Sequence, residues 1–311
     1  MHDWRARMAE RSCGFVAVLG ASNVGKSTLV NRLVGTKVSI VTPKVQTTRS
    51  RVIGIALVGD AQIIFIDTPG IFVPKKRLER AMVSAAWSGA RDADIVLVLI
   101  DAKHGLDKHS RLIVEHLCKD GRQALLAINK IDTVERNSLL RVAAEFDAEK
   151  LADGSDMFAA IFMISALTGD GVDDLQEALG GRMRAGPWHY PADQAADMPM
   201  RLLAAEITRE KVFLQLQQEL PYAIAVETEA WRERDDGSVR VDQVLYVRRD
   251  SQKSIVLGKD GRRIKAIGSA ARYELQEMLG RSAHLFIHVK VRDDWHDNPE
   301  RYRDIGLNFD V

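Results

Sequence analysis

The segment GASNVGKS at residues 20–27 constrains the fold of this chain more than any other part of its sequence. It has the P-loop spacing GxxxxGKS, follows an apolar run at residues 15–19 and precedes a segment of helical period. In a P-loop, backbone N–H groups surround phosphate oxygens while the next helix directs its positive end at the same anion. A glycine-rich turn that matched by chance would not be expected to have these flanking elements. The sequence therefore predicts a nucleoside triphosphate site at a strand-to-helix junction.

The side chains of Lys26 and Ser27 have defined tasks in such a loop. Lys26 is expected to reach the β- and γ-phosphates and to stabilise charge on the transferring phosphate. The Ser27 hydroxyl is expected to bind Mg²⁺. The expected nucleotide contacts of this segment are Gly20, Asn23, Val24, Gly25, Lys26, Ser27 and Thr28.

Length and charge limit the remaining possibilities. A chain of 311 residues exceeds the size that one core usually supports, so two domains are expected. The formal net charge is only +1, so a polyanionic partner would require a local basic patch. Two cysteines, Cys13 and Cys118, fit no metal spacing and indicate a reducing compartment. Residues 1–11 lack the apolar region of a signal peptide and the run at 95–100 is too short to span a bilayer, so we expect a cytoplasmic protein.

Short β-rich runs alternate with segments of helical period from residue 14 onward. This order predicts an α/β domain with a mixed, mostly parallel sheet and helices on both faces. Gly59-Asp60 between the second and third runs is typical of a hairpin, so one strand should be antiparallel. The expected strands are 15–19, 52–58, 62–66, 95–100, 124–128 and 158–164, and the expected helices include 78–91, 108–119 and 172–183.

A proline-containing segment at residues 186–199 separates this part from a second pattern. It has few periodic apolar positions, so we expect a linker between one domain at 12–185 and another at 200–311. The second pattern predicts a separate α+β domain. Its expected elements are a helix at 200–219, strands at 222–231 and 239–247 joined by Asp236-Gly237, helices at 254–257 and 262–279 around a loop at 258–261, and a strand at 284–291.

The motif Asp67-Thr68-Pro69-Gly70 comes directly after an apolar strand at 63–66. Ligands in open α/β sheets bind at the carboxyl ends of the strands. Asp67 is therefore expected to hold Mg²⁺, through water because this ion keeps much of its hydration shell. The N–H of Gly70 is expected to meet the γ-phosphate. An ordinary turn of Asp, Pro and Gly is the alternative, and the preceding P-loop makes it the lesser interpretation.

The motif Asn129-Lys130-Ile131-Asp132 ends the next strong strand and predicts which base is bound. An ionised Asp132 only accepts hydrogen bonds, and guanine offers two adjacent donors where adenine presents an acceptor. Asn129 is expected to bond N7 of the base or to tie loops together, and the stem of Lys130 to lie over the base plane. After one further strand, the backbone N–H groups of Ser165, Ala166 and Leu167 are expected at the guanine O6. A solvated loop is the alternative for the first motif.

With these motifs in this order, residues 20–167 resemble the Ras-like GTPases of the translation-factor class. In that class a threonine in the mobile loop after the first helix binds Mg²⁺, which favours Thr48 here, with Thr47 as the alternative. The water-orienting glutamine of Ras-type enzymes is replaced by Ile71 followed by Phe72, so hydrolysis should be slow or should use another element. In related GTPases an asparagine at the position of Asn23 helps bind K⁺, which predicts faster hydrolysis in K⁺ than in Na⁺. The expected catalytic residues are Lys26, Thr48, Gly70 and Asn23, and the expected metal ligands are Ser27, Thr48 and Asp67.

Gly258-Lys259-Asp260-Gly261 lies between two expected helices. A GxxG loop in this setting is how KH domains hold about four nucleotides of a nucleic-acid backbone, and the order of elements fits a type II KH domain. A structural α+β appendage is the alternative. Asp260 weakens the signal, and Ile255, Leu257, Ile264 and Ile267 are expected either in an apolar groove for bases or in the core. The expected RNA contacts are Lys253, Gly258, Lys259, Gly261, Arg262, Arg263 and Lys265, with Arg272 adding to the local positive charge.

A Ras-like GTPase domain joined by a short linker to a C-terminal type II KH domain resembles one family, the bacterial ribosome-biogenesis GTPases named Era. The resemblance covers nearly the whole chain. It implies hydrolysis of GTP to GDP and phosphate, binding to small-subunit ribosomal RNA near its 3′ end and assistance to maturation of the small ribosomal subunit. It also implies GTP, GDP and Mg²⁺ as ligands, a monomer, and peripheral association with the inner membrane, which the composition does not demand. One departure is Ala21-Ser22 in place of the more usual Arg-Pro or Ala-Pro.

Two other classes of function compete with this one. The first is an RNA-binding module whose nucleotide site hardly turns over, which phosphate release with and without ribosomal RNA would distinguish. The second is a GTPase whose KH-like domain binds protein. Changes at Lys259 and Arg262 would alter RNA affinity and its salt dependence only if RNA is the partner.

Overall fold

The structure is a computed structural model that describes residues 11–217, 220–292, 299–304 and 306–311. The chain divides into two compact units. The first comprises Met1–Ser39, Val45–Asp197 and Arg303–Val311, and the second comprises Ile40–Lys44 and Met198–Tyr302. The main division falls at the end of the expected linker. Two short segments depart from the expected linear boundaries because their tertiary contacts are non-local. Ile40–Lys44 groups with the second unit, and Arg303–Val311 groups with the first.

The first unit contains a mixed sheet in the order β2-β3-β1-β4-β5-β6. β2 and β3 pair antiparallel across the expected hairpin, while the pairs β3-β1, β1-β4, β4-β5 and β5-β6 are parallel, which confirms the mostly parallel sheet. The strands are β1 Ser12–Leu19, β2 Val52–Val58, β3 Ala61–Asp67, β4 Ile95–Asp101, β5 Ala124–Asn129, β6 Phe158–Met163 and the short β7 Arg184–Ala185, which pairs with β1.

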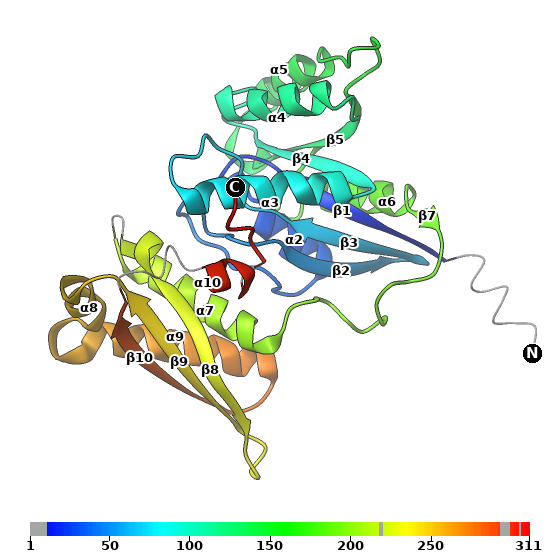
Figure 1. Ribbon diagram of the computed structural model, residues 1–311. Helices are drawn as coiled ribbons and strands as arrows, with labels where there is room; N and C mark the ends of the chain where they lie inside the picture. Colours follow the sequence, from blue (N-terminus) through cyan, green and yellow to red (C-terminus); the bar gives the residue numbers. More distant parts are fainter. Residues whose placement is uncertain (1–10, 218–219, 293–298, 305) are drawn as a thin grey trace, which may run out of the picture. The chain divides into compact units, whose positions relative to one another are not determined.

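Helices cover the strands of this sheet (Figure 1). They are α2 Lys26–Val34, α3 Arg77–Asp92, α4 Lys108–Lys119, α5 Arg136–Asp147 and α6 Val172–Gly180. Apolar residues of α3, α4 and α5 form one core cluster with β1, β4 and β5, while α2 and α6 pack on β2 and β3. In the view of Figure 1, α3 crosses in front of the strands and α2 and α6 lie behind them. The parallel strands bring the loops after β1, β3, β4 and β5 to one edge of the sheet.

The expected linker is held along the edge strand β2. The backbone N–H of Ile55 donates to the carbonyl oxygen of Ala195 at 2.8 Å, and that of Asp197 donates to the carbonyl of Ile53 at 3.3 Å. The Gln62 side chain accepts from the N–H groups of His189 and Tyr190 at 2.9 and 3.0 Å. This segment therefore covers an edge that would otherwise expose unpaired backbone groups.

The C-terminal residues grouped with the first unit contact α3. The Arg80 guanidinium donates to the main-chain oxygen of Val311 at 3.3 Å, and the guanidinium of Arg77 lies 4.4 Å from the ring centroid of Phe309. Both arginines are in the first turn of α3, the next helix after the motif at residues 67–70, which is called the DxxG loop from here on.

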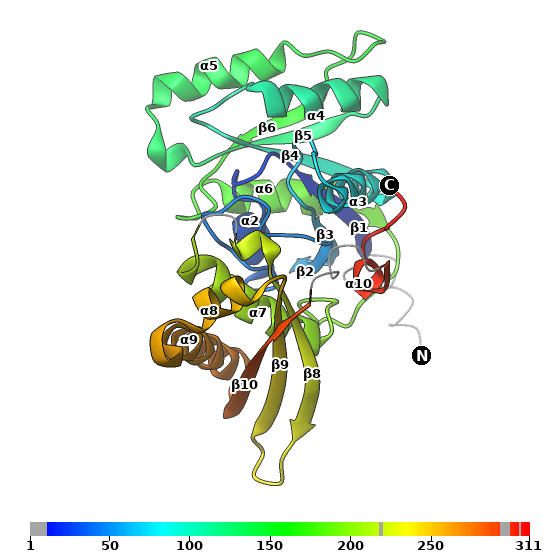
Figure 2. The same ribbon diagram turned by 60° about the vertical axis from the view of Figure 1, so that its left-hand side comes forward.

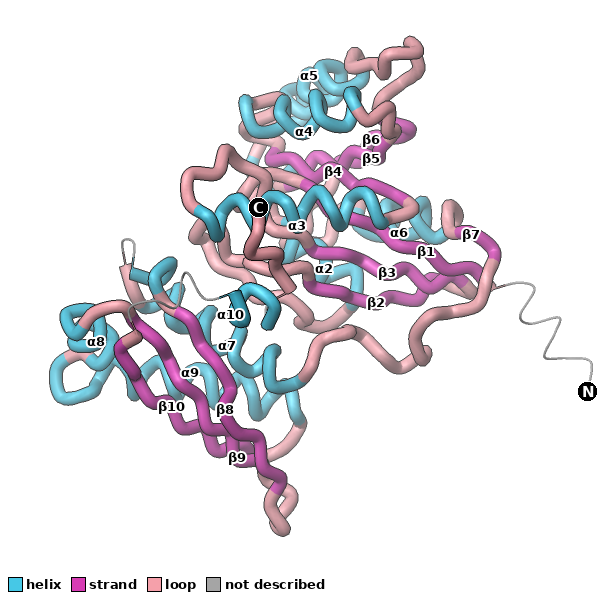
Figure 3. Tube along the Cα trace, viewed as in Figure 1, coloured by secondary structure: helices cyan, strands magenta, loops and turns pink. Residues whose placement is uncertain are grey.

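The second unit has a three-stranded sheet in the order β10-β9-β8, in which β9 pairs antiparallel with β8 and parallel with β10. Its elements are α7 Met200–Gln215, β8 Ala225–Glu233, β9 Val239–Val247, α8 Asp250–Leu257, α9 Arg262–Leu279 and β10 Ala283–Val291, with α10 Pro299–Asp304 following. Figures 2 and 3 show α7, α8 and α9 on one side of these strands. This arrangement confirms the expected α+β domain. The expected helix at 200–219 ends at Gln215, and residues 218–219 lie outside the described part of the chain.

No helix within the described residues is both long and apolar enough to cross a membrane.

Candidate functional site

The helix α2 begins at the P-loop with no side chain capping its first turn. Its N-cap, Gly25, has φ of 103°, and a Cβ at that position would lie 2.4 Å from Nδ2 of Asn129. By contrast, the Asp107 carboxylate caps α4 by accepting from two backbone N–H groups. The first N–H groups of a helix require an acceptor, so the start of α2 is suited to an anion.

The ammonium group of Lys26 lies inside the P-loop. It donates to the carbonyl oxygens of Gly20 at 3.1 Å and Ala21 at 2.9 Å, and only 7% of the residue is exposed. Burial lowers the pKa of Lys26 to about 8, an effect that the charge of Asp67 partly opposes. A phosphate bound beside this ammonium would supply the counter-charge and favour the protonated form.

The carboxylate of Asp67, at the end of β3, is surrounded by hydroxyl groups. Its Oδ2 accepts from Oγ of Ser27 and from Oγ of Ser39, both at 2.7 Å. The hydroxyls of Ser27 and Thr48 lie 2.9 Å apart, within hydrogen-bond distance. Burial raises the pKa of Asp67 in spite of these hydrogen bonds.

This cluster fits Mg²⁺. The Oδ1 of Asp67 is buried and has no hydrogen-bond partner among the described residues, although a buried carboxylate oxygen normally has one. A carboxylate and hydroxyl oxygens are the hard ligands that this ion takes alongside water. The residues that would hold it are the predicted Ser27, Thr48 and Asp67. When bound, the ion would neutralise negative charge on the phosphates.

Ser39 belongs to this cluster and was not predicted. It is 2% exposed and brings its hydroxyl to Asp67 from a loop. The sequence carries no signal for it, because a serine in a loop has no fixed spacing from a strand carboxylate.

The loop after β3 packs directly on the P-loop. The N–H of Ile71 donates to the carbonyl oxygen of Gly20 at 3.0 Å, and Ile71 forms a parallel bridge with Ala21. A Cβ at Gly70 would lie 2.6 Å from Oγ of Ser22, so only glycine allows this approach. Ile71 is 3% exposed. A buried apolar side chain in this position cannot orient a water molecule.

The Asn129 side chain ties two loops together, which is one of the two roles expected for it. Its Nδ2 donates to the carbonyl oxygen of Val24 at 2.7 Å, and its Oδ1 accepts from the N–H of Ala166 at 2.9 Å. Asn129 is 2% exposed, and Val24 is also buried. The P-loop and the loop at residues 165–169, called the base loop from here on, are therefore joined through one amide.

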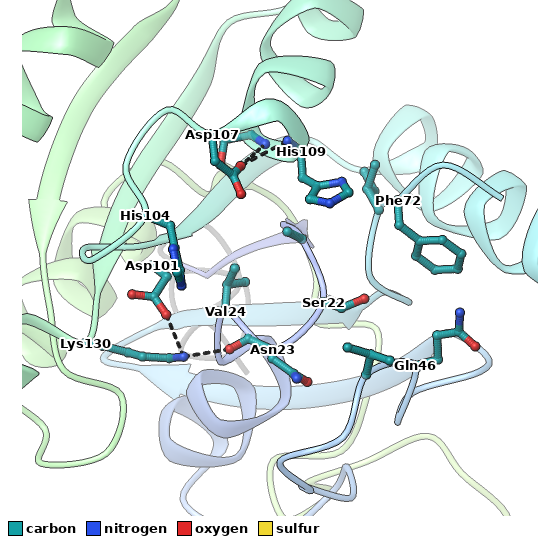
Figure 4. Close-up of a pocket in the computed structure, with 14 residues that line it drawn as sticks. Ser22, Asn23, Val24, Gln46, Phe72, Asp101, His104, Asp107, His109 and Lys130 are labelled. Carbon is teal, nitrogen blue, oxygen red and sulfur yellow. Dashed lines mark hydrogen bonds and ion pairs between the residues drawn. The ribbon is translucent and has the colours of Figure 1, made fainter. Parts of the chain in front are cut away.

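Lys130, in the loop that follows β5, contacts the P-loop. It has φ of 64°, and its ammonium donates to the carbonyl oxygen of Asn23 and to the Asp101 carboxylate, both at 2.8 Å (Figure 4). Asn23 also has positive φ, at 64°. These contacts extend the lysine along one side of the P-loop, so its stem is placed to line the site.

The remaining predicted base contacts differ in exposure. Asp132 lies in a single 3-10 turn, Ile131–Thr133, and its side chain is exposed. Leu167 is 72% exposed, which is unusual for a large apolar side chain, whereas Ser165 is fully buried. An exposed apolar side chain and an exposed acceptor-only carboxylate suit a planar base with donors on one edge.

A cavity of about 450 Å³ opens beside the P-loop. Figure 4 shows the side chains of Ser22, Gln46, Phe72 and His109 on its walls. Gln46 has φ of 56° and donates to Glu79 of α3 at 3.4 Å, so the loop that carries Thr48 is in contact with the helix that follows the DxxG loop. Thr28, the last predicted contact of the P-loop, is half-buried in the first turn of α2.

The GxxG loop in the second unit has the backbone that its glycines predict. Gly258 and Gly261 have φ of 69° and 71°, and Asp260 between them has φ of 53°. A Cβ at Gly258 would lie 2.8 Å from Cβ of Arg263. Gly261 is the N-cap of α9, whose first turn no side chain caps. An uncapped helix start after a glycine loop is a site for phosphate oxygens.

The predicted RNA contacts surround this loop. Lys259, Arg262, Arg263 and Lys265 are exposed and Lys253 is half-buried. The Arg263 guanidinium donates to the carbonyl oxygen of Ile255 at 2.8 Å, and Arg262 lies 3.8 Å from Asp260. Ile255 is 48% exposed. Of the apolar residues expected either in a groove or in the core, Ile267 is fully buried and belongs to the core.

A mostly parallel sheet with a P-loop, a buried strand carboxylate and the Asn129-Lys130 motif at its carboxyl edge defines a Ras-like GTPase domain. The order αββααβ in the second unit, with GxxG between its last two helices, is that of a type II KH domain. Residues 15–130 match the family described as 50S ribosome-binding GTPase, and residues 219–296 match the KH domain family.

Relatives match both domains together. The chain is 57% identical over 301 residues to GTPase Era of Bradyrhizobium sp. strain BTAi1, covering 97% of this chain and 96% of the relative. It is 58% identical over 297 residues to GTPase Era of Mesorhizobium japonicum, covering 95% and 94%. The chain therefore belongs to the GTPase Era family, as its motifs predict, and is a GTPase.

Solved structures agree with this assignment. A crystal structure of Era in complex with MgGDPNP and nucleotides 1506–1542 of 16S ribosomal RNA has a TM-score of 0.88 and 38% identity, covering 96% of this chain and 99% of that chain. A variant of Aquifex aeolicus Era bound to GDP·AlF₄⁻ also has a TM-score of 0.88, with 39% identity over 95% of this chain and 99% of that chain.

Proposed function

We propose that this GTPase is a switch whose KH unit binds small-subunit ribosomal RNA near its 3′ end and that assists maturation of the small ribosomal subunit. The 16S ribosomal RNA fragment bound by the similar Era structure supports this choice of RNA. The positive-φ GxxG loop and the uncapped start of α9 support phosphate binding by this chain itself.

The single observation that carries the proposal concerns the loop between α2 and β2. Ile40–Lys44, from this loop, belongs to the compact unit that contains the KH elements. There the N–H of Val41 donates to Oε1 of Glu210 in α7 at 2.8 Å. The Lys44 ammonium donates to the carbonyl oxygens of Phe213 and Leu216 at the C-terminal end of α7. A cation at the end of a helix satisfies its last carbonyls and complements the helix dipole.

The same loop carries two residues of the hydroxyl cluster around Asp67, of which Thr48 is a proposed Mg²⁺ ligand. Ser39, which directly precedes this segment, donates to Asp67, and Thr48, which follows it, bonds Ser27. When Mg²⁺ and the γ-phosphate bind or leave, the residues around Asp67 would move. That movement would act on Ile40–Lys44, the segment that α7 holds. This supports a coupling between the bound nucleotide and the conformation of the KH unit. Nucleotide and Mg²⁺ would act on the parts of the loop that carry Ser39 and Thr48, and RNA would act through the unit that holds Ile40–Lys44.

In the proposed hydrolysis, Lys26 and the N–H of Gly70 contact the terminal phosphate, and water is the nucleophile. The Mg²⁺ ligands are Ser27, Thr48 and Asp67, with Thr48 preferred over Thr47 because its hydroxyl reaches Ser27. Asn23 is the proposed K⁺ contact. A cytoplasmic location stays a prediction from the sequence, and a monomeric state and peripheral contact with the inner membrane stay predictions.

The test is RNA affinity in defined nucleotide states. A fragment of the 3′ end of 16S ribosomal RNA is titrated against the full chain with GDPNP, with GDP and without nucleotide. We expect affinity to differ between GDPNP and GDP, and Lys259→Gln to weaken binding and lower the dependence on salt by about one counterion. Lys290→Gln is the matched control, because Lys290 lies on β10 of the same unit and pairs with Glu229 at 2.9 Å. Equal affinity in all states would contradict a switch, and equal loss in both variants would contradict the GxxG site.

Phosphate release measured with and without this RNA separates the switch from an RNA-binding module that hardly turns over. Release that RNA does not change, together with unaltered RNA affinity of Lys259→Gln, would favour a protein partner for the KH unit instead.

A further inference from the structure

Arg32, in the last turn of α2, is bonded to the base loop. Its Nε donates to the carbonyl oxygen of Ala166 at 2.7 Å, and its Nη2 donates to the carbonyl oxygen of Leu167. The helix end is satisfied in another way, because the N–H of Gly35 donates to the carbonyl oxygens of Asn31 and Arg32. The guanidinium of Arg32 therefore forms hydrogen bonds with a loop more than 130 residues further along the chain, and not with the end of its own helix.

The base loop is shaped to receive this side chain. Gly169 has φ of 103°, and a Cβ there would lie 2.9 Å from Nη1 of Arg32. The N–H of Gly169 donates to the carbonyl oxygen of Ser165 at 2.8 Å, which closes the loop into a turn. Gly169 thus supplies both the left-handed backbone and the space beside the guanidinium.

Because the peptide bond is planar, these contacts also fix the direction of the N–H group of Leu167. The carbonyl of Ala166 and the N–H of Leu167 belong to one peptide, and no described peptide bond is cis, so the two groups point in opposite directions. An Ala166 carbonyl held by Arg32 aims the Leu167 N–H away from α2. The preceding peptide is fixed separately, since the N–H of Ala166 donates to Oδ1 of Asn129.

We infer that Arg32 is a positioning residue for guanine recognition, which holds the Leu167 peptide so that its N–H is directed at O6 of the base. The inference rests on the predicted assignment of the loop at residues 165–167 to O6. That prediction included three N–H groups, but those of Ser165 and Ala166 donate to Asp170 and Asn129 in this structure, so the assignment is narrowed to the N–H of Leu167. It adds a requirement that the base-loop motif does not contain, namely a donor on α2 that sets the orientation of the loop. Adenine has an amino group at this position, so an N–H donor fixed there rejects it.

One helix then connects the two ends of the nucleotide site. α2 begins with Lys26 beside the proposed phosphates, and Arg32 lies six positions later, about 9 Å along the helix axis. Phosphate contacts at its start and the base-loop contacts near its end are carried by the same rigid element. Arg32 itself touches neither the base nor the phosphates in this arrangement.

The test uses Arg32→Met in the full chain, which keeps a long side chain and removes the donors. Affinities for GDP, IDP and ADP are measured by competition with a fluorescent guanine nucleotide. GDP and IDP share O6, whereas only GDP has the 2-amino group. We expect GDP and IDP to weaken equally, by about tenfold, with ADP unchanged, because a hydrogen bond of this kind is worth roughly that factor. Arg32→Lys should restore part of the loss.

Arg182→Met is the matched control, because Arg182, in the turn that follows α6, also donates to a backbone carbonyl, but that of Ala178 in α6 rather than one of the base loop. A second variant, Gly169→Ala, keeps Arg32 and displaces its guanidinium, and it should reproduce the same pattern. Equal weakening of all three nucleotides, or unchanged GDP affinity, would overturn the inference. A wild-type chain that bound ADP as tightly as GDP would instead contradict the proposed guanine site.

Discussion

The hydroxyl oxygens of Ser27 and Thr48 lie 2.9 Å apart, although Ser27 is in the first turn of α2 and Thr48 is in the loop that follows this helix. Thr48 is 8% exposed, so the loop buries its side chain against the P-loop. The contact between them places two of the three proposed Mg²⁺ ligands together, and the third, Asp67, accepts from Ser27.

Replacement of Thr48 by alanine is expected to weaken Mg²⁺-dependent binding of a GTP analogue by about 10- to 100-fold, because an ion contact worth roughly 1.5 to 3 kcal/mol is lost. GDP binding should change less if the contact senses the γ-phosphate. Thr47→Ala is the adjacent control and should have a small effect. Titration of Mg²⁺ at fixed nucleotide concentration measures both, and a reversed order of the two variants would assign the ligand to Thr47.

Asp132→Asn is expected to shift preference from guanine toward xanthine nucleotides. The exposed carboxylate can only accept from the two donors of guanine, whereas an amide can also donate to the 2-oxo group of xanthine. Loss of the paired contacts should weaken GDP binding by about 100-fold, and binding of XDP should strengthen. Calorimetry with both nucleotides tests this. Unchanged preference for GDP would remove Asp132 from the base site.

The residues of the site that could be predicted from the sequence belong to short motifs. The spacing of residues within each motif is fixed because the motif has to fit one part of the nucleotide. The P-loop follows β1, Asp67 and Asn129 end β3 and β5, and the mostly parallel sheet brings these strand ends to one edge. Ser39 and Arg32 could not be found in this way. Each meets its partner through a loop whose path depends on tertiary packing, and a serine or an arginine alone has no diagnostic spacing.

The exchange of short segments between the two compact units was also beyond the sequence. Val41 and Glu210 are separated by 169 residues, and their hydrogen bond joins a backbone N–H to a helix side chain. The prolines at residues 186–199 predict a linker. They do not predict that this linker pairs with β2, because that pairing depends on the open edge of the strand. Local propensity and periodicity contain no information on such non-local contacts.

Ile71→Gln is not expected to accelerate hydrolysis, although it restores the residue type of Ras at this position. Ile71 is 3% exposed and its backbone is bridged to Ala21, so a glutamine there would be buried rather than directed at water. Burial of an amide without partners costs on the order of 1 to 3 kcal/mol, so the melting temperature should fall. Single-turnover phosphate release and thermal unfolding measure the two effects. A clear rate increase would show that this loop rearranges before hydrolysis.

Potassium is expected to increase the rate of GTP hydrolysis relative to sodium at equal ionic strength. Asn23 has positive φ and lies in the P-loop, where its carbonyl oxygen is held by Lys130. Asn23→Ala should abolish the difference between the two ions and leave the rate in sodium nearly unchanged. Phosphate release in matched chloride salts measures this, and equal rates for the wild-type chain in both salts would rule out a role for the ion.

The contacts of Lys44 with α7 give the most direct test of coupling between nucleotide and RNA. Burial lowers the pKa of Lys44, and its ammonium is retained by carbonyl oxygens at the end of a helix. Contacts of this charge-assisted kind contribute about 1 to 3 kcal/mol each. Lys44 is not one of the proposed nucleotide or RNA contacts, so its removal should change how the sites communicate rather than what each site binds.

Lys44→Met is therefore expected to leave GDP affinity within about twofold while it reduces the ratio of RNA affinities measured with GDPNP and with GDP by up to tenfold, since the lost contacts are worth roughly 1.4 kcal/mol or more. Lys119→Met, an exposed lysine at the end of α4, is the matched control and should leave the ratio unchanged. Glu210→Ala removes the neighbouring acceptor of Val41 and should act in the same direction. Because coupling is reciprocal, RNA should also cease to alter the affinity for GDPNP in both variants. A normal ratio in Lys44→Met with an intact fold would mean that α7 holds this loop without transmitting its state.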